Sequence, residues 1–304
     1  MNIQEKFEKG VIGRTYTRVD SEYKVNIFLG YNEDGQMSMV ITELGKEKLV
    51  KPSKRIDVTL KSREDGKLAL SFNLLDGAYK PIFTIFCKDM INVCELAGSS
   101  MAISNALERW NYWKEMFDKK KQNILDKMEI KGLIGELLEL KNHFMQEWEE
   151  TTAIASWMGP LLGHKDFEID DTWYEIKSIS ENAIQVKISS LEQLDSEIDG
   201  HLVIVRLEDT SPVTNNSINL NSIVMKVAEE ISNPTNRDLF MMRLDNMGYS
   251  YDEEYENYCF MYKGTEYYSV KEDFPRLTRS EVNNSIGNAS YTILLNGVSD
   301  YREV

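Results

Sequence analysis

The chain of 304 residues carries 35 Lys and Arg against 50 Asp and Glu, a formal net charge of −15, and 42% of its residues are hydrophobic. Its length and apolar content suffice to bury a full core and predict two domains. No apolar run reaches the ~18 residues of a membrane span, and the first residues lack a signal-peptide layout, so we expect neither membrane insertion nor secretion. The three cysteines lack paired metal-site spacing, which favours buried thiols and a reducing, cytoplasmic location.

Residues 1–86 have the pattern of a separate β-rich unit. Runs of alternating polar and apolar residues flank turns at 32–35 and 64–66, and Asp-Gly turns between such runs are good hairpin signals. The unit carries no catalytic constellation. The expected strands cover residues 23–28, 37–42, 56–60, 68–74 and 81–86.

Residues 87–125 are predicted to be a helical connector to a third segment, residues 126–304. Trp110 and Trp113 share an apolar stripe of the connector, where core packing is a simpler role than base stacking.

A helix is predicted over residues 127–145, where apolar residues recur at three- and four-residue spacings. Glu136 lies at the edge of this stripe, so it is either a boundary residue that reaches solvent or a functional carboxylate. Gly132 and Gly135 each lower helix stability by about 1 kcal/mol relative to Ala, which indicates close approach of another backbone. The stripe comprises Ile130, Leu133, Ile134, Leu137, Leu140 and Phe144.

Residues 164–178 predict two short strands around an Asp-Asp-Thr turn. With an even-length loop centred on Asp171 and Thr172, Ile169 pairs with Tyr174 and Asp166 pairs with Lys177. Directly opposed residues share a face, which separates an apolar face from a polar one. The apolar face holds Phe167, Ile169, Tyr174 and Ile176, and the polar face holds Asp166, Glu168, Glu175 and Lys177.

Three carboxylates and an amine on one face are suited to holding a divalent metal and activating water. An ordinary half-buried hairpin has the same two-faced pattern, so both interpretations stand at this point. A loop longer or shorter by one residue would separate the set. Glu168 is expected to be an edge residue of the hairpin rather than a ligand.

Further strands follow the hairpin. Residues 183–188 alternate as a third strand that includes Gln185, residues 189–194 begin like a capped helix, and residues 201–207 form a continuous apolar run suited to a central strand. The expected order is therefore helix, three-stranded meander, helix, strand.

The C-terminal part predicts a helical pair over residues 220–247, broken at Asn233-Pro234, and then strands at 258–262, 267–270 and 291–295. There is no Gly-rich phosphate loop, no Ser-His-Asp or Cys-His pattern with useful spacing, and no zinc spacing among the three histidines.

The helix glutamate, an aspartate thirty residues later and a Glu-x-Lys on the next strand resemble the PD-(D/E)XK nuclease superfamily. The chain looks most similar to a bacterial branch described as putative PD-(D/E)XK family members. The resemblance covers roughly residues 125–210. It departs at the name-giving proline, because Lys165 precedes Asp166 and the nearest proline is Pro160.

The resemblance implies an α/β (α+β) restriction-endonuclease-like core with an added N-terminal β-rich unit. It also implies that Asp166 and Glu175 ligate Mg²⁺, with Mn²⁺ as a possible substitute. Lys177 would be the catalytic lysine that helps to activate water, and Glu136 an accessory carboxylate at the metal. Gln185 could match a polar position that some branches use.

The chemistry of these residue types agrees with that assignment. Mg²⁺ takes oxygen ligands and usually only one or two protein carboxylates, with water and phosphate completing its shell. Phosphodiester hydrolysis accumulates negative charge in the transition state, which a cation stabilises. Lys177 lies beside carboxylates that favour its charged form, so orienting water suits it better than acting as a general base.

Two functions follow as alternatives: a Mg²⁺-dependent endonuclease acting on DNA, within a restriction or defence system, or a catalytically silent DNA-binding or assembly subunit on the same scaffold. A homodimer or defence-system partner proteins are expected. Residues 1–150 carry 23 basic and 24 acidic residues, whereas residues 151–304 carry 12 and 26, which disfavours DNA binding by the second half. Two basic clusters are the first phosphate contacts to test: Lys46, Lys48, Lys51, Lys54 and Arg55, and Lys119, Lys120 and Lys121.

Overall fold

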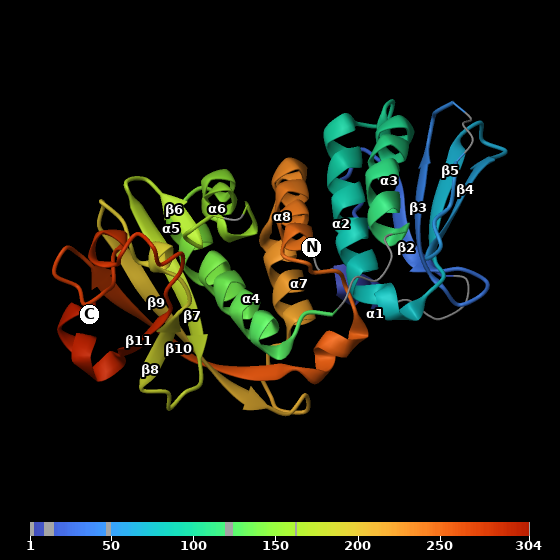
Figure 1. Cartoon of the computed structure of the whole chain (residues 1–304). Coiled ribbons are helices and arrows are strands. Elements are labelled where there is room, and N and C mark those ends of the chain that lie inside the picture. The colour runs from blue at the N-terminus through green and yellow to red at the C-terminus, as the bar shows by residue number, and fades with distance from the viewer. Residues whose placement is uncertain (1–2, 9–14, 47–49, 119–123, 162, 304) are drawn as a thin grey trace. The chain divides into compact units, whose positions relative to one another are not determined.

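The computed structural model describes residues 3–8, 15–46, 50–118, 124–161 and 163–303, and it shows a mixed α/β protein of two compact units (Figure 1). The units are Met1–Lys121 and Gln122–Val304. The mixed α/β fold class predicted from the sequence is confirmed. Lys48 and Lys119–Lys121 of the two basic clusters lie outside the described residues.

The first unit is an antiparallel sheet covered by helices. The five strands lie in the order β1-β2-β3-β5-β4. Their bounds, with those of the helices, are β1 (Tyr16–Arg18), β2 (Ile27–Tyr31), β3 (Met37–Glu43), β4 (Ile56–Ser62), β5 (Leu68–Leu74), α1 (Ile3–Glu8), α2 (Lys80–Ala97) and α3 (Ala102–Asp118).

Residues 81–86 form the first turns of α2 and not the expected strand. Pro81 lies at the start of the helix, where its missing N–H costs nothing. Phe83, Phe86 and Met90 then recur at helical spacing and are fully buried. A six-residue apolar window cannot separate the two periodicities, whereas the 18 residues of α2 do.

The two helices at residues 80–118 pack on the first sheet, where the sequence suggests a connector. Phe86 on α2 contacts Phe72 on β5 with ring centroids 5.1 Å apart, and Trp110 on α3 contacts Phe72 at 5.5 Å. Trp110 and Trp113 are core residues, both about 1% exposed.

The second unit contains a four-stranded sheet in the order β10-β9-β7-β6. β7 and β9 are parallel, and the other neighbours are antiparallel. The strands are β6 (Phe167–Ile169), β7 (Thr172–Ile179), β8 (Gln185–Ile188), β9 (Gly200–Thr210), β10 (Cys259–Val270) and β11 (Tyr291–Leu294). The helices are α4 (Lys127–Glu139), α5 (Met145–Glu147), α6 (Glu150–Ser156), α7 (Leu220–Glu230) and α8 (Pro234–Asn246), with a π-helical turn at Leu140–Phe144.

The strand that follows the hairpin, β8, does not continue the expected three-stranded meander. β8 pairs with β11 in a two-stranded sheet, and β9 takes the place beside β7. β8 buries alternate residues only, whereas β9 is buried along most of its length and suits the sheet interior. Val186 and Ile188 of β8 pack with Trp173 and Leu202 of the larger sheet in one core. The expected helix after β8 is a single 3₁₀ turn, Leu191–Gln193.

The helical pair at the C-terminal part is present as α7 and α8, with Asn233 capping α8 ahead of Pro234. The two strands expected at 258–262 and 267–270 are one continuous strand, β10, whose pairing with β9 shifts between Tyr262 and Gly264. Gly264 has φ +125°, a conformation that glycine permits, so the bulge keeps the strand intact. Among the described residues, none of the helices has the length and apolarity needed to cross a bilayer.

Candidate metal and catalytic site

The hairpin at residues 167–179 has a different register from the expected one but the expected faces. Ile169 pairs with Thr172 and Phe167 with Tyr174, so the prediction that Ile169 opposes Tyr174 is wrong. Asp170 adopts φ +53° and closes a tighter loop with Asp171. The shift amounts to two residues, and an even shift leaves every side chain on its own face.

Asp166 lies immediately before β6 begins. Its Oδ2 accepts the backbone N–H of Ile176 at 2.7 Å, and its carbonyl accepts the N–H groups of Met158 and Gly159 at 2.8 and 3.1 Å. The residue is partly exposed. Burial raises the pKa of Asp166, while Lys177 and the Ile176 N–H lower it. Its backbone and one carboxylate oxygen are therefore held, and Oδ1 faces the rest of the site.

Glu175 and Lys177 form a close ion pair on β7, with Lys177 Nζ 2.6 Å from Glu175 Oε1. The Glu175 side chain is 1% exposed and that of Lys177 is 17% exposed, so the amine is the more accessible end of the pair. Burial, and then the Asp166 carboxylate, raise the pKa of Glu175 to about 8 against the lowering effect of Lys177.

Glu136 projects from α4 toward the same place. It is 8% exposed, and its Oε2 accepts the indole N–H of Trp157 at 2.7 Å. Burial and then the Asp166 carboxylate raise the pKa of Glu136 well above its ordinary value. The prediction that Glu136 lies off the solvated face of its helix is confirmed by this burial.

Gly159 marks where Glu136 and Asp166 converge. A Cβ built on Gly159 would lie 3.2 Å from Glu136 Oε2 and 3.4 Å from Asp166 Oδ1. The two oxygens therefore border the same small space beside Gly159. Among the described residues, no three His, Cys, Asp or Glu side chains are close enough to hold a metal ion together. A site built on a pair of carboxylates completed by water still suits Mg²⁺, which often has only one or two protein carboxylates.

Other predicted positions lie outside this cluster. Gln185 is exposed on β8 opposite Leu294, in the other sheet from Asp166 and Glu175. Glu168 is exposed opposite Trp173, as expected of a hairpin edge.

Lys165, which stands where the superfamily has its proline, is a buried residue that the pattern does not single out. Its Nζ donates to the carbonyls of Glu192 and Gln193 at 2.8 Å and of Asp195 at 3.2 Å, and it lies 3.8 Å from the centroid of the Trp173 ring. Burial lowers the pKa of Lys165 to about 8. The lysine thus ties the strand that carries Asp166 to the 3₁₀ turn after β8, a contact between residues far apart in sequence.

A second buried acid on α4, Glu139, is structural. Its oxygens accept the hydroxyls of Thr265 at 2.7 Å and Tyr267 at 2.5 Å. Burial raises the pKa of Glu139, while these two donors lower it. Each Glu139 oxygen thus accepts a hydrogen bond from β10, which holds this carboxylate against that strand.

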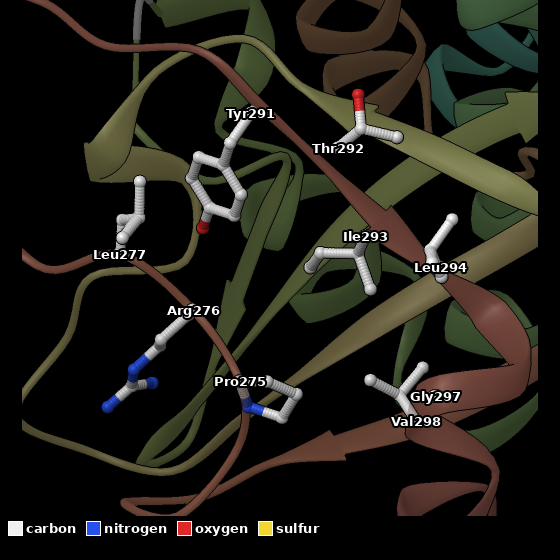
Figure 2. Close-up of a pocket in the computed structure, with 9 residues that line it drawn as sticks. All are labelled: Pro275, Arg276, Leu277, Tyr291, Thr292, Ile293, Leu294, Gly297 and Val298. Atoms are coloured by element: carbon white, nitrogen blue, oxygen red, sulfur yellow. The ribbon is translucent and has the colours of Figure 1, made fainter.

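An apolar pocket of about 400 Å³ lies elsewhere in the second unit, and Figure 2 shows Tyr291, Ile293 and Pro275 around it. Arg276, also at its wall, donates to the carbonyls of Leu194 at 3.0 Å and Ser196 at 3.3 Å. None of Glu136, Asp166, Glu175 or Lys177 lines this pocket, so it is distinct from the carboxylate site.

The sequence was compared with family models, curated proteins and solved structures. A family model described as "Putative PD-(D/E)XK family member, (DUF4420)" matches residues 3–296. The comparisons with curated proteins and with solved structures find no match. Since the family model spans nearly the whole chain, including Glu136, Asp166, Glu175 and Lys177, the chain belongs to the putative PD-(D/E)XK family DUF4420.

Proposed function

We propose that this protein is a Mg²⁺-dependent endonuclease-like phosphodiesterase that acts on DNA, with Mn²⁺ able to replace Mg²⁺. The observation that carries the proposal is the convergence of Glu136 and Asp166 on the space beside Gly159, next to the Glu175–Lys177 pair. Family membership supports the same chemistry.

The roles follow from what each residue can do. Asp166, together with one of the two glutamates, Glu136 or Glu175, would hold the cation, and water would complete its shell. The cation when bound supplies Lewis-acid stabilisation of the charge that develops on the phosphate. Asp166 is suited to this role because its backbone and Oδ2 are fixed and Oδ1 is directed at the site. The Lys177 amine is more accessible than Glu175, so it can orient a water by hydrogen bonding and balance charge on the attacking oxygen.

A second candidate is a catalytically silent DNA-binding or assembly subunit. The charge distribution favours it: residues 151–304 carry 26 acidic against 12 basic residues. Such a surface repels a phosphate backbone, and bound cations would offset only part of that charge. A defence-system partner that supplies basic surface would reconcile cleavage with this charge, and a homodimer is the other assembly that we propose. A cytoplasmic location suits either function.

Incubation of the purified chain with plasmid and Mg²⁺ or Mn²⁺ separates the two functions. We expect nicking or linearisation by the wild type and a loss of at least ~100-fold for Asp166→Ala and Lys177→Ala. Glu168→Ala, which removes an exposed carboxylate two residues from Asp166, is the matched control and should cleave like the wild type. Equal cleavage by all four proteins, or metal-independent DNA binding without cleavage, would contradict the nuclease proposal.

A further inference from the structure

Three consecutive residues, Trp157, Met158 and Gly159, contact two of the acidic residues of the site, Glu136 and Asp166. The Trp157 indole donates to the side chain of Glu136, and the Met158 and Gly159 N–H groups donate to the backbone carbonyl of Asp166. Trp157 also pairs with Phe167, the first residue of β6, in an isolated antiparallel bridge. One short segment therefore holds the Glu136 carboxylate and the backbone of Asp166.

Arg243 on α8 holds this segment in place. Its guanidinium donates to the carbonyls of Ile154 and Trp157, and to that of Ala155 at 3.1 Å. Arg243 is 4% exposed and Trp157 is fully buried. Since the ring also packs against Phe240, with centroids 6.1 Å apart, the indole has little freedom to turn away from Glu136.

Gly159 is not required by its backbone conformation. It is not among the residues with positive φ, so an L-residue could adopt the same backbone. What a side chain would change is the space, because a methyl group would contact Glu136 Oε2 and Asp166 Oδ1 at 3.2 and 3.4 Å. The glycine thus keeps the volume between the two oxygens open to a small polar occupant.

We infer that the Trp157–Gly159 segment is a working part of the cation site: Trp157 is a positioning residue that aims Glu136, and Gly159 keeps free the space in which the cation or its water lies. This inference rests on the proposed function and deepens it. Indole donation occupies one side of Oε2 and orients the carboxylate, as hydrogen bonds to metal-binding carboxylates generally do. Neither residue belongs to the Glu, Asp and Glu-x-Lys pattern read from the sequence.

The test is Mn²⁺ binding to the full chain, measured from the electron paramagnetic resonance signal of free Mn²⁺. We expect Trp157→Phe, which keeps a ring but removes the donor, to weaken binding by about 10-fold, and Gly159→Ala by about 10- to 100-fold. In an Glu136→Gln background, Trp157→Phe should have little further effect, because its contribution passes through Glu136.

Matched controls are available in the same unit. Gly132→Ala adds a methyl group where no atom lies within 4 Å. Trp148→Phe removes the 3.3 Å indole hydrogen bond to Asp170, which is not one of the carboxylates of the site. Both should bind Mn²⁺ like the wild type. If Gly159→Ala does not fold, the double-mutant cycle of Trp157→Phe and Glu136→Gln still tests the positioning role of Trp157.

The outcomes distinguish this inference from the function beneath it. Wild-type binding with unchanged binding by Trp157→Phe and Gly159→Ala would overturn the inference and leave the proposed function standing. A wild type that binds no Mn²⁺ would overturn both. Equal effects of Trp157→Phe with and without Glu136 would show a general structural role and overturn the positioning assignment.

Discussion

Glu136 and Glu139 lie about one helical turn apart on α4 and are both buried, but their carboxylates have different surroundings. Both oxygens of Glu139 accept hydrogen bonds from β10, one from the Thr265 hydroxyl and one from the Tyr267 hydroxyl. Glu136 Oε2 accepts from Trp157 and still borders the space beside Gly159. A buried carboxylate that is only partly satisfied is costly to the fold, and such sites are where function is expected to outweigh stability.

Glu175 allows this cost to be measured through pH. Its pKa is raised from 4.5 to about 8, so the folded chain favours the neutral acid, and stability is lost as pH rises through about 8. We expect metal-free wild type to lose stability between pH ~5 and ~9, and Glu175→Gln, which cannot ionise, to be more stable by about 2–4 kcal/mol at the upper end and little changed at the lower.

Chemical denaturation across that pH range checks the prediction. Adding Mg²⁺ at alkaline pH should stabilise the wild type more than Glu175→Gln. If Glu175→Gln is less stable than the wild type throughout the pH range, the Glu175–Lys177 pair stabilises the fold and does not destabilise it.

Among the secondary-structure elements, β7 carries Glu175 and Lys177, so the position of the site depends on how this strand is held in the sheet. β7 is held on one edge by β9, whose parallel register sets Trp173 opposite Gly200. The Trp173 ring lies directly over Gly200, so a Cβ at that position would be 2.1 Å from a ring carbon. The ring is 2% exposed and also packs under Lys165, which leaves it little room to move.

Gly200→Ala should therefore destabilise the chain by about 2–3 kcal/mol, because an added methyl group must displace a packed indole ring. Thermal unfolding with Gly132→Ala as the control measures it, and that control should be neutral or stabilising by up to about 1 kcal/mol. A Gly200→Ala variant as stable as the wild type would mean that the Trp173 ring is free to shift.

Elements with a long, uniform hydrophobic periodicity can be predicted from the sequence, but the elements and residues that they pair with cannot. The helix at 127–139, the faces of the hairpin and the central strand β9 follow from spacing alone. The pairing of β8 with β11 and the contacts of Lys165 and Trp157 depend on residues distant in the chain. The Trp157–Glu136 bond spans 21 positions, and no local pattern of either residue indicates it.

At the scale of the whole molecule, the candidate site is contained in one unit. Glu136, Asp166, Glu175 and Lys177, with Trp157 and Gly159, all lie within Gln122–Val304. The first unit contributes a separate sheet and helices with its own aromatic core around Phe72 and Phe86. The chain's acidic excess lies in residues 151–304, the part of the sequence that also contains Asp166 and Glu175, so a cation bound to them would neutralise part of this negative charge.

Whether a cation binds between the carboxylates can be seen in an anomalous difference map from crystals of the full chain soaked in Mn²⁺. We expect a peak beside Gly159, in contact with Asp166 and with Glu136 or Glu175, that is absent from Asp166→Ala crystals. Ordered crystals whose Mn²⁺ peaks all lie away from Asp166 would contradict it.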